Sequence, residues 1–369
     1  MRVTLGDVCE KGASNIKQSD IANMTGEYPI YGAAGYIGNV DFYHQEKPYV
    51  AIVKDGAGIG RTTLHPAKSS VIGTMQYLLP KDNVLPEYLC YVVRHMHLEK
   101  YFTGATIPHI YFRDYKNEKF NLDSLDKQAE IIEILGKAES IILKRRKELA
   151  ELDNLIKARF VEMFGIYPAN QMGWETGKIR DTVADVRYGS SRPAVDGGKY
   201  PYLRMNNITY GGELDISDVK RIDVPENELD KCTVRRGDVL FNRTNSKELV
   251  GKTCVYDRDE MMVLAGFVIR VRVNDRVLPE FLSAFLNTDF SKKTLSEMCK
   301  AAIGQANINA QEMQNIGLYL PPLELQRQFV QFKKQIDKSK VVESIHRMNV
   351  LFNITLNGGN RYDIRANEF

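Results

Sequence analysis

Residues 84–89 read Val-Leu-Pro-Glu-Tyr-Leu, and residues 277–282 read Val-Leu-Pro-Glu-Phe-Leu. Further short segments recur in the same order along the chain. They are Glu27–Pro29 with Lys199–Pro201, Gly60–Thr62 with Gly251–Thr253, Ile72–Gly73 with Ala265–Gly266, and Leu125–Gln128 with Leu323–Gln326. Matches that keep one order indicate an internal duplication. Because the period is far longer than a solenoid repeat, we predict two copies of one domain-sized module.

Length and composition are those of a globular protein. The chain has 369 residues, of which 43% are hydrophobic and 26% charged, with a formal net charge of +3. The length predicts two or three domains, and the composition excludes a disordered or fibrous chain. No apolar run is long enough for a membrane helix, and the first residues lack the apolar core of a secretory signal. The five cysteines form no CxxC pair, which favours a cytoplasmic protein without disulfides or a zinc site.

Each copy is predicted to be a compact α+β domain, at residues 1–122 and 172–320. Short β-type runs occupy residues 49–53, 238–241 and 266–273. The two Val-Leu-Pro-Glu segments are typical of helix starts, because proline is tolerated in the first turn and the acidic residue suits the helix dipole.

A long helix is predicted after each domain, at residues 123–165 and 321–345. In the first helix, mostly apolar residues recur at alternating three- and four-residue steps, which is the heptad pattern of a coiled coil. At 1.5 Å per residue this helix is about 60 Å long and cannot bury its apolar stripe on one small domain. We therefore predict two similar domains separated by two long antiparallel coiled-coil helices. The alternative is two unrelated surface helices, each packed on its own domain. The predicted seam residues are Ile131, Leu135, Ala138, Ile142, Leu149, Leu152, Ile156, Met163, Leu325, Phe329, Phe332 and Ile336.

The end of the chain departs from the repeat. Equivalence with the first copy extends the second helix to about residue 362, but its heptad pattern fades after Ser344. Residues 346–369 are rich in asparagine and contain Gly358-Gly359. We therefore predict an atypical tail over 346–369, which means that the second helix is short or that the end of the gene has been altered.

Several strings resemble enzyme motifs without completing them. The glycines in residues 55–61 follow a GxGxG spacing instead of the GxGxxG of a dinucleotide site. Gly251-Lys252-Thr253 resembles the end of a P-loop, but Ser246 stands where the first glycine belongs. His95 and His97 are two residues apart on a predicted helix and point to different faces. We identify no catalytic residues and no metal ligands, which favours a binding role.

Side chains suited to DNA gather in loops at equivalent places of the two copies. Arginine, asparagine and glutamine make bidentate contacts with base edges, whereas lysine, serine and threonine suit phosphates. The alternative is that these loops are ordinary polar turns. The residues predicted to contact DNA are Lys54, Arg61, Thr62, Thr63, His109, Tyr111, Asn242, Arg243, Thr244, Asn245, Ser246, Lys252, Gln305 and Asn307.

The duplicated order of motifs resembles the specificity (S) subunits of type I restriction-modification systems. The resemblance runs from about residue 5 to residue 344. It rests on Leu320–Phe329, on its echo at Leu122–Ile131, on Gly304–Ile308, and on the two Val-Leu-Pro-Glu helix starts.

The resemblance implies a subunit with no chemistry of its own. Each domain would read one half of a bipartite double-stranded DNA site, and the helix pair would set the distance between the halves. Methyltransferase (M) and restriction (R) subunits would be the partners. S-adenosylmethionine, ATP and Mg²⁺ would belong to them, so that this chain is expected to carry no cofactor. Two other functions stay open: a stand-alone DNA methyltransferase or nuclease with an unrecognised site, and a coiled-coil scaffold that does not bind DNA.

Overall fold

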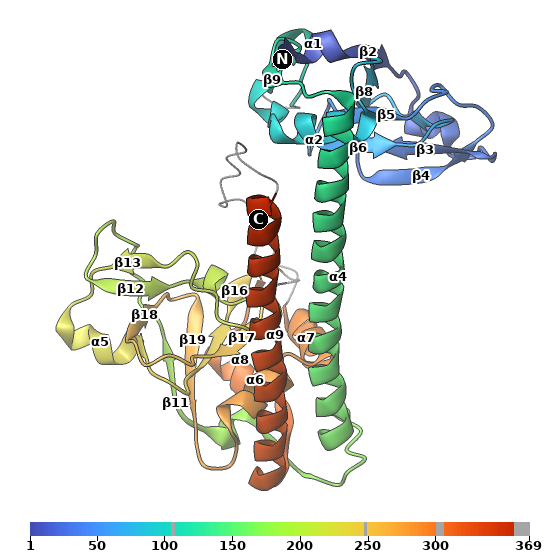
Figure 1. Cartoon of the computed structure of the whole chain (residues 1–369). Coiled ribbons are helices and arrows are strands. Elements are labelled where there is room, and N and C mark those ends of the chain that lie inside the picture. The colour runs from blue at the N-terminus through green and yellow to red at the C-terminus, as the bar shows by residue number, and fades with distance from the viewer. Residues whose placement is uncertain (105–107, 247–248, 300–305, 358–369) are drawn as a thin grey trace. The chain divides into compact units, whose positions relative to one another are not determined.

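The computed structural model describes residues 1–104, 108–246, 249–299 and 306–357 (Figure 1), with side chains as far as residue 340. The chain divides into two compact units, the first containing Met1–Leu143 and the second Lys144–Asn349.

The first unit alternates short strands with short helices before a long helix. Its elements are β1 (Arg2–Thr4), α1 (Leu5–Val8), β2 (Cys9–Ala13), η1 (Gln18–Ile21), β3 (Tyr28–Gly32), β4 (Gly35–Val40), β5 (Tyr49–Val53), β6 (Thr62–His65), β7 (Ser70–Val71), β8 (Met75–Pro80), α2 (Pro86–His95), η2 (Leu98–Tyr101), α3 (Phe112–Tyr115), β9 (Lys119–Asn121) and the start of α4 (Leu125–Phe164).

The second unit follows the same plan with additional elements. After the end of α4 come β10 (Glu175–Lys178), η3 (Ile179–Thr182), β11 (Val183–Tyr188), β12 (Tyr200–Leu203), η4 (Met205–Asn207), β13 (Lys220–Ile222), α5 (Glu226–Cys232), β14 (Thr233–Val234), β15 (Val239–Asn242), β16 (Thr244–Asn245), β17 (Thr253–Val255), β18 (Met262–Leu264), β19 (Val268–Val273), α6 (Pro279–Leu286), α7 (Asp289–Met298), β20 (Ala306–Asn307), α8 (Ala310–Gln314), β21 (Gly317–Leu320) and α9 (Leu323–Asn357).

The sheets of the two units share one strand topology. The order β2-β8-β5-β6 in the first unit corresponds to β11-β19-β15-β17 in the second, and β4-β3-β7 corresponds to β13-β12-β18. The pairing of β3 with β7 in the first unit is parallel, and so is that of β12 with β18 in the second. Each domain has a further pair of antiparallel strands, β1 with β9 in the first unit and β10 with β21 in the second. The predicted duplication of an α+β domain is therefore confirmed.

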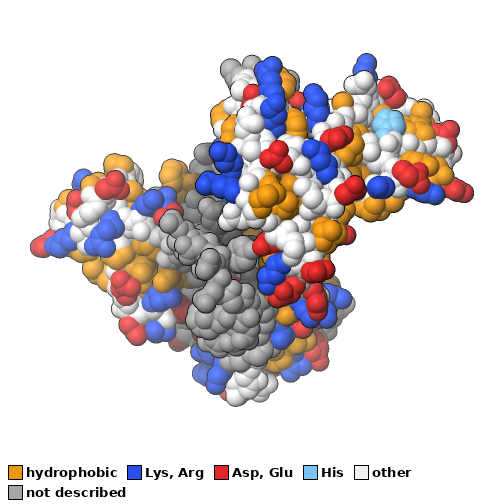
Figure 2. All heavy atoms as spheres, turned by 45° about the horizontal axis from the view of Figure 1, so that its top comes forward, with side chains coloured by type: hydrophobic (Ala, Val, Ile, Leu, Met, Phe, Trp, Pro, Cys, Tyr) orange, Lys and Arg blue, Asp and Glu red, His pale blue; other side chains and the backbone are white. Residues whose placement is uncertain are grey.

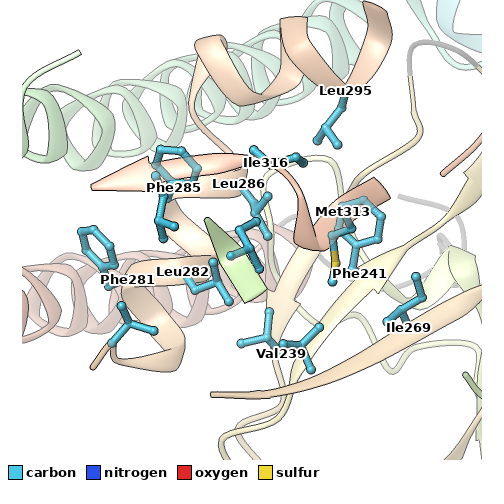
Figure 3. Packing of buried hydrophobic residues seen from close by; sticks show 14 of the residues in the cluster. Val239, Phe241, Ile269, Phe281, Leu282, Phe285, Leu286, Leu295, Met313 and Ile316 are labelled. Carbon is cyan, nitrogen blue, oxygen red and sulfur yellow. The ribbon is translucent and has the colours of Figure 1, made fainter. Parts of the chain in front are cut away.

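Each domain has its own hydrophobic core between the larger sheet and the helix that begins with Pro-Glu. In the first unit all of β5 is buried, and Val50 and Ile52 pack with Leu89 and Val93 of α2. In the second unit β15 and β19 face α6, as Figure 3 shows for Val239, Ile269 and Phe281, among others. Burial of these large apolar side chains is the main term that stabilises each domain.

The end of α4 packs on α9 in the antiparallel direction within the second unit (Figure 1). The Phe329 ring lies 5.2 Å from Phe160 and 5.7 Å from Phe164, measured between ring centroids. Farther along α9, Lys340 forms an ion pair with Asp153, which lies earlier on α4. Because the partners on α4 move backward as α9 proceeds, the two helices are antiparallel, as predicted.

The helix α9 reaches Asn357, past the end at residue 345 that the heptad pattern predicted. An α-helix needs backbone hydrogen bonds and no strong breaker, and residues 346–357 contain neither proline nor glycine. The first such residues are Gly358-Gly359. The loss of the heptad pattern after Ser344 therefore does not mark the end of the helix.

Candidate nucleic-acid interface

The loop after β5 and the loop after β15 have the same backbone frame. In the first copy the Val53 N–H donates to the Arg61 carbonyl at 2.9 Å, and the Gly60 N–H donates to the Val53 carbonyl at 2.9 Å. The same two hydrogen bonds recur in the second copy, at 2.8 Å, among Asn242, Gly251 and Lys252. Both glycines have positive φ, 82° and 77°, a conformation that favours glycine. This repeated pair of bonds makes Arg61 equivalent to Lys252.

A second loop lies against the first in each copy. The Ile110 N–H donates to the Lys54 carbonyl, and the Ile308 N–H donates to the Arg243 carbonyl, both at 2.9 Å. Lys54 is therefore equivalent to Arg243. The loop before α3 brings His109 beside Lys54, and the loop before α8 brings Asn307 beside Arg243. The structure thus gathers predicted residues from both loops at one place in each copy.

In the first copy this place is occupied by an acid between two basic side chains. His109 Nδ1 lies 2.7 Å from Asp55 Oδ1, and Lys54 forms an ion pair with the same carboxylate. Burial raises the pKa of Asp55, but the hydrogen bonds from Lys54 and His109 more than offset it and hold the pKa below its usual value. Tyr111 is exposed and stacks beside His109, with a centroid distance of 6.3 Å. The Arg113 guanidinium covers the Tyr111 ring at 4.9 Å.

In the second copy the equivalent cation is an arginine stacked on an aromatic ring. The Arg243 guanidinium carbon lies 4.9 Å from the centroid of the Tyr188 ring. The Tyr188 hydroxyl accepts a hydrogen bond from the Ala310 N–H at 2.9 Å, which fixes the ring against α8. Within the described part of the chain no carboxylate pairs with Arg243, and its buried Nε has no hydrogen-bond partner. The second site therefore presents an arginine whose Nε–H has no partner among the described residues.

Four predicted DNA-contacting residues are buried, with exposed fractions of 5% (Thr62), 0% (Asn242), 6% (Thr244) and 8% (Lys252). The Thr62 hydroxyl donates to the Gly60 carbonyl at 3.0 Å, and Lys252 Nζ donates to the Met205 carbonyl at 3.0 Å. These side chains turn inward and hold the loops, so that the prediction of a surface contact is not carried forward for them.

The remaining predicted residues are distributed around the two loops. Arg61 is exposed and donates to the Ala33 carbonyl at 2.9 Å. The Thr63 hydroxyl lies 2.7 Å from His65 Nε2. Asn245 and Ser246 are partly exposed. Gln305 lies outside the described residues.

Sequence reasoning missed Asp55 and Tyr188. Asp55 follows Lys54 directly, and two adjacent opposite charges before a glycine loop were a usable signal. Tyr188 is far from Arg243 in sequence and reaches it only because β11 and β15 both pair with β19. No local sequence pattern around Tyr188 predicts this contact.

A partly buried lysine lies behind the second loop. Lys292 Nζ donates to the Gly251 carbonyl at 2.8 Å and lies 5.7 Å from the centroid of the Tyr210 ring. Burial, together with the charges of Lys157 and Lys252, lowers the pKa of Lys292 to about 8.

Charged side chains of both signs are mixed on the face shown in Figure 2. Lysine and arginine are interspersed there with aspartate and glutamate, in keeping with a net charge of +3. Among the described residues no three histidine, cysteine or acidic side chains are grouped to hold a metal. Nor does the described part of the chain contain a helix long and apolar enough to cross a membrane.

The sequence is similar to known specificity subunits. It is 26% identical over 168 residues to the putative type I restriction enzyme MjaX specificity subunit of Methanocaldococcus jannaschii, covering 44% of this chain and 39% of the relative. It is 25% identical over 199 residues to the EcoKI specificity subunit of Escherichia coli, covering 53% and 42%. The MjaVIII specificity subunit of M. jannaschii matches at 25% over 341 residues, covering 84% and 78%. The chain thus spans about two-fifths of the first two relatives.

Solved structures and a family model agree on the architecture. The S subunit of a type I system from M. genitalium has a TM-score of 0.54 and 14% identity, covering 96% of this chain and 95% of that one. A structure from work on assembly and conformational transition of the type I R-M system has a TM-score of 0.51 and 16% identity, covering 97% and 95%. The family model described as "Type I restriction modification DNA specificity domain" matches residues 1–154 and 172–348. Since these two matches include most of the chain, the protein belongs to the type I restriction-modification DNA specificity family.

Proposed function

We propose that this chain is the DNA-specificity subunit of a type I restriction-modification complex and that each copy reads one half of a bipartite site. One observation carries the proposal: two copies of one backbone frame present different side chains at the same place. Lys54 and His109 stand in the first copy where Arg243 and Asn307 stand in the second. A shared frame with different side chains is what two unlike half-sites require.

The chemistry of the second loop pair suits base reading. An arginine guanidinium donates two parallel hydrogen bonds to the O6 and N7 atoms of guanine. Contact with the Tyr188 ring restricts the guanidinium of Arg243, so that less side-chain freedom is lost on binding. Asn307 is exposed beside it and suits an adenine edge.

The proposal assigns catalysis to partners. M subunits would bring S-adenosylmethionine, and R subunits would bring ATP- and Mg²⁺-dependent cleavage, whereas this chain would supply no catalytic group. Such a complex would act in the cytoplasm, where the DNA is. The absence of the expected enzyme motifs and the membership of a DNA specificity family support this division of roles.

The test is to purify the chain with its M subunit and map methylated positions on a random duplex library by sequencing. We expect two short defined sequences separated by a constant gap, because each mismatched base pair costs about 1–3 kcal/mol. Methylation without sequence preference would contradict the proposal. Methyl transfer or cleavage by the chain alone would favour a stand-alone enzyme instead.

A further inference from the structure

A buried glutamine fastens the start of the long helix α4 to the first domain. Gln128 is 0% exposed. Its Oε1 accepts a hydrogen bond from the Leu85 N–H at 2.8 Å, and its Nε2 donates to the Asn83 carbonyl at 3.0 Å and to the Asp123 carbonyl at 2.9 Å. One side chain therefore joins α4 to the turn before α2 and to the segment before α4 itself.

The second copy repeats this arrangement bond for bond. Gln326 of α9 is also 0% exposed. Its Oε1 accepts from the Leu278 N–H at 2.8 Å, and its Nε2 donates to the Arg276 carbonyl at 3.1 Å and the Pro321 carbonyl at 2.8 Å. Leu85 and Leu278 are the N-cap residues of α2 and α6, and neither offers a side-chain capping group.

Only an amide satisfies all three backbone partners. The site requires one acceptor and two donors, which the glutamine side chain supplies. A nonpolar side chain of the same length would leave one N–H and two carbonyls without partners, and a carboxylate would face two carbonyl oxygens. The recognition loops of the two copies have diverged in their side chains, whereas this set of bonds is the same in both.

The length of the helix makes its angle of departure important. The 40 residues of α4 extend over about 60 Å. A tilt of about 3° at the base would move the far end of such a rod by about 3 Å, which is close to the 3.4 Å rise of one base pair. To hold the gap between the half-sites to within one base pair, the start of the helix must therefore keep a fixed direction relative to its domain.

We propose that Gln128 and Gln326 are positioning residues that fix the direction in which each long helix leaves its domain, and that they thereby set the gap between the half-sites. This inference rests on the proposed function. The two glutamines touch no DNA in this account and act through the helices.

The test removes the hydrogen bonds of each glutamine side chain but fills the same space with a side chain of similar size. Gln128→Met, Gln326→Met and the double variant are purified with the M subunit. Methylation is then measured on duplexes that carry both wild-type half-sites at the wild-type gap and at gaps one or two base pairs shorter and longer. Matched controls are Val71→Ala and Val263→Ala, which remove buried methyl groups from the parallel strand pairs at sites outside the glutamine contacts.

We expect the methionine variants to retain both half-sites while their preference for the wild-type gap over neighbouring gaps falls about tenfold, the scale of a lost buried hydrogen-bonding partner. The valine controls should lower the yield of folded protein but keep the gap preference. If the double variant does not fold, the single variants carry the test, since each leaves one glutamine in place. Unchanged gap preference in the single variants would overturn the inference while leaving the proposed function standing. A wild-type complex without a bipartite site would instead overturn the proposed function.

Discussion

The loop pairs of the two copies differ in side-chain chemistry on a shared backbone. In the first copy Asp55 lies between Lys54 and His109, so that most of the positive charge is neutralised within the site. In the second copy Arg243 stacks on Tyr188 and pairs with no described carboxylate. The difference teaches that the frame and the proposed reading surface are separable: backbone hydrogen bonds and buried threonines hold the loops, while the exposed side chains differ between the copies.

A second contrast concerns the contacts that the long helices make in the two units. At the start of α4, polar groups of α2 contact the helix, with the Tyr91 hydroxyl 3.0 Å and Arg94 Nη1 3.2 Å from the Glu139 carboxylate. In the second unit α4 and α9 meet through aromatic rings in edge-to-face contact, and Phe329 is 0% exposed. Apolar burial stabilises more than exposed ion pairs do, so removal of the Phe329 ring is expected to cost more than removal of the Glu139 charge.

The largest expected effect is that of Phe329→Ala. Loss of this ring leaves a cavity beside Phe160 and Phe164 and should lower the stability of the second unit by about 3–5 kcal/mol. Glu139→Gln in the first unit should cost at most about 1 kcal/mol. Denaturant unfolding with hydrogen exchange resolved along the chain measures both. Comparable losses in the two units would contradict the contrast.

Next in size is the effect of Arg243→Ala on DNA recognition. Loss of a bidentate base contact should weaken discrimination at one position of one half-site by about 1–3 kcal/mol. Arg243→Lys should not restore it, because an ammonium lacks the planar pair of donors. Lys54→Ala should have a smaller effect, since Asp55 already pairs with that ammonium. Binding to duplexes with single substitutions in each half-site gives the comparison, and equal losses in both half-sites would exclude independent readers.

The partly buried Lys292 predicts a pH dependence confined to the second unit. Its pKa is lowered to about 8 in the folded protein from an ordinary value of 10.5. Between these two values the unfolded chain binds the proton and the folded chain does not, so stability should rise with pH across this window. The slope approaches about 1.4 kcal/mol per pH unit.

Lys292→Met isolates this contribution, because it leaves all other titrating groups in place. The unfolding free energy of the wild type minus that of the variant should increase from pH 8 to pH 10. A constant difference would show that the ammonium is not desolvated in the folded chain.

The smallest expected effect is that of Asp55→Asn, which sharpens the comparison between the loops. Removing the carboxylate frees Lys54 for a phosphate and should raise affinity a few-fold at low salt. The slope of log K against log salt should become steeper by about 0.9. Titration at several salt concentrations measures this slope, and no change would mean that Lys54 does not approach the DNA.

The sequence predicted the two domains and the long helices well, but it predicted the candidate site only in part. Repeated hexapeptides predicted two like domains, and heptad spacing predicted the antiparallel helices, because both signals are long and periodic. Burial of Thr62, Asn242 and Lys252 was not predictable, since whether a polar side chain after a strand turns inward depends on the loop that it holds. The contact of Tyr188 with Arg243 depends on sheet pairing across the domain. The heptad pattern did not predict that α9 reaches Asn357, because such a pattern reports a packing face, whereas a helix can continue beyond that face.

One transfer experiment tests the central claim most directly. Lys54→Arg, Asp55→Thr and His109→Asn together place the side chains of the second loop pair on the first frame. The methylated motif of the complex is then read by sequencing. We predict that the first half-site changes while the second half-site and the gap stay as in the wild type. Simultaneous change of both halves, or a motif with no division into halves, would contradict two independent readers on one repeated frame.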